Sequence, residues 1–331
     1  MHIVFFEVEP WEEDYLKKSF RSAEFFDTVL TKQKIKKIKD AEIISVFIYS
    51  KLDQKKLSQL PNLKLIATRS TGFDHIDVDY CRRNNVKIAT VPDYGQNTVA
   101  EHAFALILAI SRKIVPSVER AKTGIFKLAG LRGFDLAGKT IGIIGTGSIG
   151  EHMARIANGF QMKVLGFDLK HNQSLVNKYN LKYTQTLVEL VANSDIISLH
   201  LPLNEHTHYI VNKELLNQTK RGAILINTAR GALVDNEALL WALDEGIISA
   251  AGLDVLEEEP LISEERELLL ERINHEDLRD LLCDHILIKH PNVLITPHNA
   301  FNSKEALLRI LDTTILNIKN YLDNHSKNII D

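Results

Sequence analysis

Three polar clusters in the second half of the chain carry residue types that could do chemistry together. They are Arg230, the glutamates at 257–259 and His298, and each lies at or just after a predicted strand. An arginine fork can hold a carboxylate and polarise a carbonyl. A histidine can move a proton near neutral pH, and a carboxylate behind it favours its protonated form. In this order the clusters meet the needs of hydride transfer between a nicotinamide and a 2-hydroxy acid.

Each cluster taken alone also has an ordinary structural explanation. Arg230 could be a surface arginine in a loop, and three successive glutamates are more typical of a solvated acidic turn. Isolated histidines are more often structural, and the chain has 13 of them. The functional interpretation therefore depends on the three clusters together, because the carboxyl ends of parallel strands meet at the ligand edge of a sheet.

A glycine-rich turn precedes these clusters. The apolar run 140–144 leads into Gly145, Gly147 and Gly150 at the spacing GxGxxG, and a helical pattern follows. The three glycines suit a tight turn, close approach of a pyrophosphate and close helix–strand packing. The diphosphate would lie at the positive N-terminal end of the helix. The motif alone also occurs in ordinary strand–helix turns, but Asp168 ends the next predicted strand, where a carboxylate is expected to meet the ribose hydroxyls.

Short apolar strands alternate with helical patterns along the chain, which indicates βαβ units and parallel sheets covered on both faces. The strands predicted in the first part are 2–6, 28–30, 43–48, 63–67 and 86–90, with helices such as 11–19 and 77–84 between them. The strands predicted in the second part are 141–144, 164–167, 196–199, 223–226, 250–255 and 293–296. Six strands would complete a dinucleotide-binding sheet.

Two helices predict how the domains connect. Thr98 with Glu101 forms a capping-box pattern, so a helix is expected to begin there, and its nearly continuous apolar surface predicts burial. The glycine-dotted segment 122–139 is expected to be an irregular arm. The amphipathic pattern at 304–322 is expected to return and pack on the first domain.

The fold class expected from this order is α/β, with two doubly wound parallel-sheet domains. A Rossmann cofactor domain, 100–299, would be inserted into a flavodoxin-like substrate domain made of 1–99 and 300–331. A chain of 331 residues is long enough for two cores. A ligand site where the chain crosses twice between domains would suit hinge closure.

Composition excludes several classes of protein. The net charge is −3, with both signs spread along the chain, which argues against nucleic acid as an obligatory partner. The lysine-rich stretch 32–39 is interrupted by Ile35 and Ile38 and predicts the solvated face of a short helix. Cys81 and Cys283 fit no metal-ligand spacing and predict free thiols in a reducing cytosol. No signal peptide or membrane span is expected.

The chain resembles the D-isomer-specific 2-hydroxyacid dehydrogenase family over nearly its whole length. The resemblance rests on many motifs in order, of which the glycine turn is one. The others are RSTGFDHID at 69–77, VPDYGQNTVAEH at 91–102, HLP at 200–202, NTARGALVD at 227–235, LDV at 253–255, EP at 259–260 and TPH at 296–298.

The resemblance implies a role for each catalytic residue. Arg230 would bind and polarise the substrate, His298 would be the acid/base, and Glu259, the glutamate directly before proline, would orient the histidine. Glu257 and Glu258 would then be bystanders. Further substrate contacts are expected from Tyr49, Thr71, Gly72, Tyr94 and Phe301, with backbone amides around Thr71 and Gly72 receiving the carboxylate.

The resemblance also implies NAD as the cofactor and no metal. The residues expected to bind NAD are Gly145, Thr146, Gly147, Ser148, Ile149, Gly150, Asp168, His200, Pro202, Thr207, Thr228, Ala229 and Asp254, the last of these at the nicotinamide carboxamide. NAD is preferred over NADP because Asp168 would repel a 2′-phosphate, although Lys170 lies close by in the sequence.

The subgroup most similar is D-lactate dehydrogenase. Tyr49, Tyr94, Phe301 and the long segment between Pro260 and Pro291 favour it, whereas Pro297 departs from the glycine more usual in that subgroup. The alternative substrates are glyoxylate, hydroxypyruvate and branched 2-ketoacids. Phosphoglycerate dehydrogenases often add a C-terminal domain, and formate dehydrogenases of the family carry glutamine in place of the glutamate.

A rival from another class is a nucleotide-sensing corepressor built on the same fold, which would act by docking partner peptides. Those relatives tend to carry tryptophan beyond the histidine and long tails. The expected partners are a small 2-ketoacid or 2-hydroxyacid and a second copy of the chain. The apolar helix after Thr98 and the arm 122–139 predict a homodimer through the cofactor domain.

Overall fold

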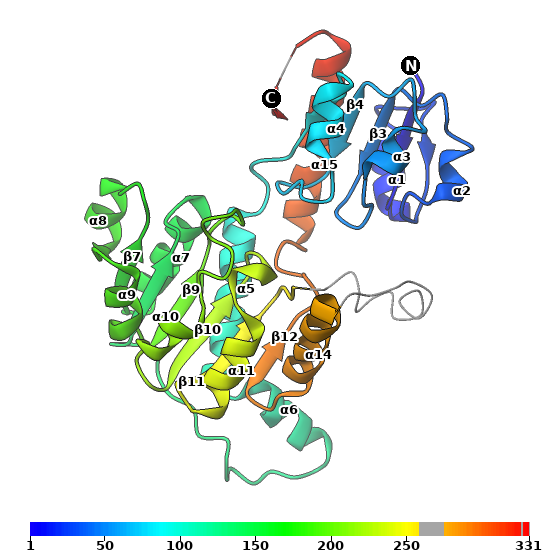
Figure 1. Cartoon of the computed structure of the whole chain (residues 1–331). Helices are drawn as coiled ribbons and strands as arrows, with labels where there is room; N and C mark the ends of the chain where they lie inside the picture. Colours follow the sequence, from blue (N-terminus) through cyan, green and yellow to red (C-terminus); the bar gives the residue numbers. More distant parts are fainter. Residues whose placement is uncertain (258–274, 326, 331) are drawn as a thin grey trace. The chain divides into compact units, whose positions relative to one another are not determined.

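The structure is a computed structural model that describes residues 1–257, 275–325 and 327–330 (Figure 1). Its internal contacts divide the chain into two compact units. The first contains Met1–Gly95 and Ser303–Asp331, and the second contains Gln96–Asn302. The second unit is therefore an insertion in the first, with divisions a few residues from the expected 99/100 and 299/300.

The first unit is built on a sheet with the strand order β13-β5-β4-β3-β1-β2. Strands β1 to β5 are parallel in the order 2-1-3-4-5, which is the flavodoxin-like arrangement, and β13 pairs antiparallel with β5. The bounds are β1 Ile3–Phe5, β2 Glu24–Phe25, β3 Ile43–Val46, β4 Leu65–Thr68, β5 Lys87–Ala89 and β13 Ile329–Ile330.

Helices cover both faces of this sheet. The long helix α15 packs Leu311 and Ile318 against Phe5 on one face, as expected for its amphipathic pattern. On the other face Ile35 and Ile38 are fully buried, which confirms the short helix with a solvated lysine face. The bounds are α1 Pro10–Leu16, α2 Lys32–Ile35, α3 Gln54–Leu57, α4 Val78–Arg83 and α15 Lys304–Leu322.

The predicted strand at 28–30 is wrong, because the edge strand β2 lies earlier, at Glu24–Phe25. Two aromatic pairs explain the difference. The ring of Phe25 stacks on Phe5 with centroids 5.2 Å apart, and the ring of Phe26 stacks on Phe6 at 5.0 Å. Successive aromatic residues thus pack on opposite faces of the sheet, and this fixes the pairing at Phe25 rather than further along the chain.

The second unit is built on a parallel sheet with the order β12-β11-β10-β9-β6-β7-β8. This is the Rossmann order 3-2-1-4-5-6 extended by one strand. The additional seventh strand is β12, at the edge beyond β11, whereas β8 takes position 3 of the Rossmann order, is short and was not predicted. The bounds are β6 Thr140–Ile144, β7 Lys163–Phe167, β8 Lys182–Tyr183, β9 Ile196–Leu199, β10 Ala223–Asn227, β11 Ile248–Leu253 and β12 Val293–Ile295.

Two apolar clusters cover the faces of this sheet. Successive residues of β6, such as Ile143 and Ile144, belong to different clusters, one packed under α5, α7 and α8 and the other under α9, α10, α11 and α14 (Figure 1). The helix bounds are α5 Gln96–Ser111, α6 Ile114–Lys122, α7 Ser148–Gly159, α8 Gln173–Tyr179, α9 Leu187–Asn193, α10 Lys213–Asn217, α11 Asn236–Asp244 and α14 His275–Lys289, and the 3-10 turn η1 lies at Gly231–Leu233.

The predicted capping box at Thr98 is wrong, because α5 begins at Gln96 and Thr98 lies within its first turn. The expected burial of this helix is confirmed by Ala103, Phe104 and Ile107, which have almost no exposed surface. Helix α5 ends at Ser111, and Lys113 turns the chain with a φ of 53° before α6 begins.

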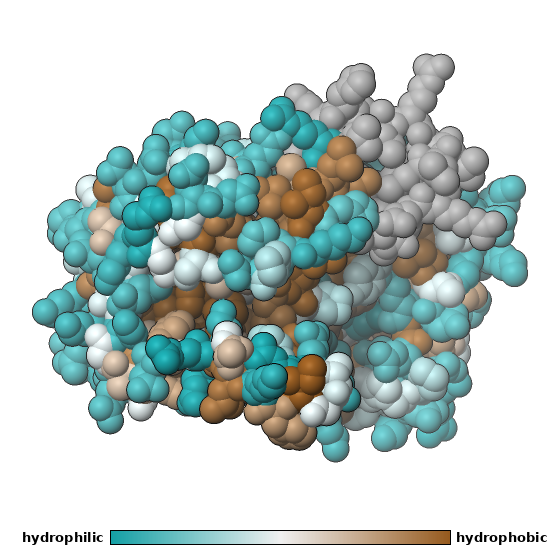
Figure 2. Space-filling view, turned by 90° about the horizontal axis from the view of Figure 1, so that it is seen from below, coloured by the Kyte–Doolittle hydropathy of each residue, from teal (hydrophilic) through white to brown (hydrophobic). Residues whose placement is uncertain are grey.

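Helix α6 and the residues after it expose apolar side chains. Phe126 and Leu128 are each 83% exposed, and Ile114, Val118 and Ile125 are also exposed. Residues 123–139 form neither helix nor strand, as expected for an arm. Figure 2 views the molecule from the side on which α6 lies in Figure 1 and shows hydrophobic residues among hydrophilic ones. Among the described residues, no helix is long and apolar enough to cross a membrane.

Candidate active site

The glycine turn joins β6 to α7 within the second unit. Gly145 has a φ of 93°, and a Cβ there would lie 2.4 Å from the carbonyl oxygen of His200. A Cβ on Gly150 would lie 2.2 Å from the carbonyl oxygen of Gly145. A Cβ on Gly147 would meet nothing within 4 Å. Packing therefore requires the first and third glycines, whereas the second borders open space.

The N-terminus of α7 faces this turn. Gly147 is the N-cap and carries no side chain to bind the first N–H groups of the helix. Ser148, Ile149 and Gly150 form the first turn, whose N–H groups have no acceptor within the helix. The helix dipole adds a partial positive charge at the same place. This end of α7 is thus suited to bind a diphosphate.

Asp168 follows β7 and folds back on the glycine turn. Its Oδ2 accepts the backbone N–H of Thr146 at 2.7 Å and the Thr146 hydroxyl at 3.2 Å. Its Oδ1 accepts the backbone N–H of Lys170 at 3.0 Å. The carboxylate is half-buried, so part of Oδ1 can still accept hydrogen bonds from a ribose diol.

Beyond β9 lie His200, Pro202 and Thr207. The Nε2 of His200 is 2.9 Å from Ser198 Oγ, and burial lowers the pKa of His200 to about 3. The ring is therefore neutral at physiological pH and is no candidate for the acid/base. The Thr207 hydroxyl donates to the carbonyl oxygen of Pro202 at 2.7 Å, which closes the loop that follows the strand.

The residues after β10 are held by the buried amide of Asn227. Its Nδ2 donates to the carbonyl oxygen of Arg230 at 2.8 Å, and its Oδ1 accepts the Ala229 N–H at 3.0 Å. The Arg230 guanidinium donates back to the Ala229 carbonyl oxygen at 2.7 Å. Thr228 Oγ1 is buried and has no hydrogen-bond partner among the described residues.

The glutamate cluster begins beside Arg230. A Cβ on Gly231 would lie 2.2 Å from the carbonyl carbon of Leu256 and 2.5 Å from the nitrogen of Glu257, so the two chain segments pass in direct contact. The Tyr209 hydroxyl donates to Glu257 Oε1 at 2.6 Å. Glu259, which the sequence assigns to the catalytic set, lies outside the described residues.

Asp254 directly follows β11, and its carboxylate is fully buried. Its Oδ1 accepts the Asn299 N–H at 2.8 Å and the Thr296 hydroxyl, and its Oδ2 accepts the Ala300 N–H at 2.8 Å. His102 Nε2 of α5 lies 3.3 Å from Oδ1. Burial by itself would raise the pKa of Asp254, but the hydrogen bonds from His102, Thr296 and the two N–H groups outweigh it and hold that pKa below its ordinary value.

His298 lies in the loop that Asp254 holds. Its backbone is left-handed, with a φ of 49°, which is uncommon for a residue other than glycine. The His298 N–H lies 2.9 Å from the carbonyl oxygens of both Asp254 and Thr296. The Phe301 ring stands edge-on to the imidazole, with centroids 6.3 Å apart.

The role of Asp254 in holding this loop could not be predicted from the sequence. Hydrogen bonds to backbone N–H groups leave no pattern in the sequence, and His102 lies far from Asp254 along the chain. The expected contact of Asp254 with the nicotinamide carboxamide stays a prediction.

The remaining predicted substrate residues lie in the first unit. Tyr49 is 61% exposed, and its N–H donates to Glu7 Oε1 at 2.9 Å. Thr71 and Gly72 come shortly after β4, and the Thr71 hydroxyl donates to the carbonyl oxygen of Val91 at 2.7 Å. The carbonyl oxygen of Tyr94 accepts Arg309 Nε at 2.5 Å.

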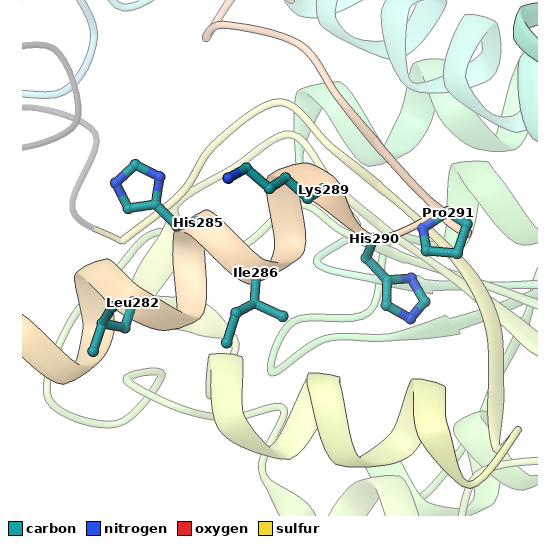
Figure 3. Close-up of a pocket in the computed structure, with 6 residues that line it drawn as sticks. All are labelled: Leu282, His285, Ile286, Lys289, His290 and Pro291. Atoms are coloured by element: carbon teal, nitrogen blue, oxygen red, sulfur yellow. The ribbon is translucent and has the colours of Figure 1, made fainter.

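A hollow on the surface of α14 is lined by a mixture of apolar and basic side chains (Figure 3). It contains none of the residues predicted for the site. Its lining residues are Leu282, His285, Ile286, Lys289, His290 and Pro291.

The second unit fits a dinucleotide on three structural observations. The space beside Gly147 admits a diphosphate, Asp168 keeps an acceptor position on Oδ1, and the buried Thr228 hydroxyl has no partner among the described residues. Among the same residues, no group of three or more His, Cys, Asp or Glu side chains could hold a metal ion.

Known proteins resemble this chain over most of its length. A family model described as "D-isomer specific 2-hydroxyacid dehydrogenase, NAD binding domain" matches residues 104–300. The D-lactate dehydrogenase of Escherichia coli is 34% identical over 326 residues, which cover 97% of this chain and 96% of that protein. The glyoxylate reductase of Pyrococcus furiosus is 33% identical over 324 residues, or 95% of this chain and 86% of that protein.

Solved structures agree with the sequence comparisons. The D-lactate dehydrogenase from Aquifex aeolicus complexed with NAD and lactic acid superimposes with a TM-score of 0.87 at 36% identity, covering 98% of this chain and 96% of that one. The predicted fold class, α/β with two doubly wound parallel-sheet domains, is confirmed. So is NAD as the cofactor.

Proposed function

The chain belongs to the D-isomer-specific 2-hydroxyacid dehydrogenases, which makes it an NAD-dependent oxidoreductase acting on the CH–OH group of a D-2-hydroxy acid, and from this premise we propose that it reduces pyruvate to D-lactate. The reverse direction uses the same residues with the proton moving the opposite way. Reductases of glyoxylate, hydroxypyruvate or branched 2-ketoacids are the alternatives within the family, and a glyoxylate reductase is among the relatives.

The observation that carries the proposal is the alignment of three neighbouring strand ends. Asn227 of β10 is in register with Leu253 of β11, and Leu253 is in register with Ile295 of β12. Arg230 and His298 follow the first and last of these residues within a few positions. The cation and the acid/base therefore leave the same edge of one sheet, which is where α/β sheets bind their ligands.

In the proposed mechanism three side chains of this protein have separate roles. Arg230 holds the ketoacid and stabilises negative charge on the ketone oxygen. His298 donates a proton to that oxygen, and Glu259 keeps the imidazole oriented and protonated. Bound NADH supplies the hydride.

In the first unit, Thr71 and Gly72 are assigned to the substrate carboxylate, with Tyr94 in the following loop as a further contact. Within the second unit, the glycine turn and Asp168 hold the adenosine diphosphate part of the cofactor. His200, Pro202, Thr207, Thr228 and Ala229 line its groove.

The choice of pyruvate is supported by the aromatic residues assigned to the substrate side chain. Phe301 stands edge-on to His298 within the second unit. A bulky ring beside the acid/base suits a methyl group better than a branched chain. The D-lactate dehydrogenases among the relatives and solved structures point the same way.

The test is a panel of 2-ketoacids assayed by loss of NADH absorbance, with a chiral assay of the product. Pyruvate is expected to give the highest kcat/KM, with D-lactate as the product. A higher kcat/KM with glyoxylate, hydroxypyruvate or 2-ketoisocaproate would replace the substrate assignment. No turnover with any ketoacid, together with intact NADH binding, would favour the corepressor-like alternative.

We also propose a homodimer that forms through the cofactor unit. The exposed apolar side chains of α6 and the arm support this proposal, because clustered exposed apolar residues often mark a protein–protein interface. They include Ile114, Val118, Phe126 and Leu128. Sedimentation velocity should give twice the chain mass at micromolar concentration. The double variant Phe126→Asp/Leu128→Asp should sediment as a monomer, whereas an unchanged dimer would place the interface elsewhere.

The proposed compartment is the cytosol. Cys81 and Cys283 are both free and buried, which suits a reducing environment. Fractionation of the source cells with activity staining would test this assignment.

A further inference from the structure

A chain of hydrogen bonds runs from β8 to the carboxylate at the end of β7. The backbone N–H of Asn172 donates to the Tyr183 hydroxyl oxygen at 2.9 Å. That oxygen lies 2.9 Å from Thr146 Oγ1, which in turn lies 3.2 Å from Asp168 Oδ2. These hydrogen bonds thus connect the glycine turn, the end of β7 and the unpredicted strand β8.

The direction of each hydrogen bond follows from the number of protons. An ionised carboxylate only accepts, so the single hydroxyl proton of Thr146 is donated to Asp168. Thr146 Oγ1 must then accept the proton of Tyr183. The Tyr183 oxygen accepts in turn from the Asn172 N–H. All three bonds point the same way, and bonds aligned in this manner strengthen one another.

The ring of Tyr183 is fixed independently of its hydroxyl. Tyr183 pairs with Gly166 in the β7–β8 register. The imidazole of His171 stacks on the Tyr183 ring, with centroids 4.0 Å apart and planes 9° from parallel. A Cβ on Gly166 would lie 3.1 Å from Thr146 Cγ2, so the glycine lets the threonine pack beside the strand. A phenylalanine at 183 would keep this packing and remove only the hydroxyl.

The acceptor capacity of Asp168 is almost filled by these contacts. Oδ2 receives both the N–H and the hydroxyl of Thr146, and Oδ1 receives the N–H of Lys170. A carboxylate has roughly four lone-pair positions, so about one remains, on Oδ1. The side chain is therefore anchored by Oδ2 and presents Oδ1 to a ligand.

We propose that Tyr183 is a positioning residue for cofactor selection. Through Thr146 it anchors the Asp168 carboxylate beside the glycine turn, so that the enzyme accepts NAD and rejects a cofactor carrying a 2′-phosphate. A phosphate at that position could be accommodated only if Asp168 turned away, and turning away breaks the two bonds from Thr146. The proposal rests on NAD as the cofactor and is independent of which ketoacid the enzyme prefers.

The test is isothermal titration calorimetry of the full-length protein with NADH and with NADPH, without ketoacid. The variants are Tyr183→Phe and Thr146→Val, which each remove one hydroxyl and keep the shape of the side chain. In both variants the Kd for NADH should rise about three- to tenfold, as expected for one lost hydrogen bond. The Kd for NADPH should stay unchanged or fall, so the preference for NADH shrinks by at least that factor.

The control is Tyr179→Phe in the neighbouring helix α8. It removes a hydroxyl that takes no part in the hydrogen bonds from Asn172 to Asp168, and it should change neither Kd. Because the two test residues act in series, the double variant Tyr183→Phe/Thr146→Val should lose no more selectivity than either single variant. Equal changes in both Kd values would reduce Tyr183 to general support of the fold and overturn the proposal. An unchanged Kd for NADH, or additive losses in the double variant, would overturn it as well.

Discussion

Replacing Asp254 with asparagine should remove the anchor of the His298 loop without changing the shape of the side chain. An asparagine offers one acceptor oxygen. If that oxygen takes the place of Oδ1, the amide group faces the Ala300 N–H, donor against donor, at a site where the hydrogen bond is now 2.8 Å long. A buried donor left unpaired costs about 1–3 kcal/mol. We therefore expect the free energy of unfolding to fall by about 2 kcal/mol.

The same change should slow catalysis more than it weakens cofactor binding. His298 keeps a left-handed backbone while the loop is held by Asp254. If His298 is the acid/base that we propose, its displacement should lower kcat by about 10- to 100-fold. Single-turnover and steady-state kinetics give kcat, and calorimetry gives the Kd for NADH. A kcat within twofold of the wild type would refute the positioning argument. A large rise in the Kd for NADH with kcat retained would instead support the contact with the nicotinamide carboxamide.

The pH dependence of stability gives a second measure of Asp254. Its pKa in the folded protein is lowered, so its contribution to stability is fully present above the unfolded-state pKa, about 3.9, and is lost as the pH falls through the folded-state value. Urea unfolding of the wild type and of Asp254→Asn should therefore differ most near neutral pH and converge in acid.

Three further predictions follow from the site. His298→Ala should lower kcat by about 10²- to 10⁴-fold with little change in the Kd for NADH, and retained turnover would show that another group is the acid/base. Burial lowers the pKa of His200 to about 3, below its unfolded value near 6.5. As the pH falls from 6.5 to 3, the unfolded state is therefore protonated first, and the wild type should lose up to about 1.4 kcal/mol of stability per pH unit. His200→Gln should lack this slope in urea titrations. Gly150→Ala forces a Cβ to 2.2 Å from a carbonyl oxygen and should lower both the melting temperature and NADH affinity, whereas Gly147→Ala, with nothing within 4 Å, should lower NADH affinity alone.

The features that the sequence predicted well depend on residues close together in the chain. The glycines at 145 and 150 are required by direct contact with backbone oxygens, so their spacing carries the fold of the turn. The helix at 304–322 was predicted to the residue, because apolar residues at helical spacing, such as Ile310, Leu311 and Ile318, define one buried face. The parallel pairing of β1–β5 and of β6–β12 follows from the alternation of strands and helices.

The features that the sequence missed depend on tertiary contacts. Strand β8 has two residues, too few for an alternating pattern, yet it places Tyr183 beside Thr146. The Thr98 capping pattern was overridden, because the helix extends back to Gln96. The partners of Asp254 are backbone N–H groups, the Thr296 hydroxyl and a distant histidine, and these meet only after the sheet has formed.

The left-handed backbone of His298 has a consequence for preparing an inactive enzyme. In the proposed mechanism the position makes two separate demands, an imidazole for the chemistry and a residue that tolerates a φ of 49° for the loop. Alanine satisfies neither and carries the strain of that conformation, about 1–2 kcal/mol. Asparagine adopts left-handed geometry far more readily and cannot act as an acid/base at neutral pH. His298→Asn should thus silence the reaction while leaving the loop in place, which would make it the preferred variant for trapping a complex with both cofactor and ketoacid bound.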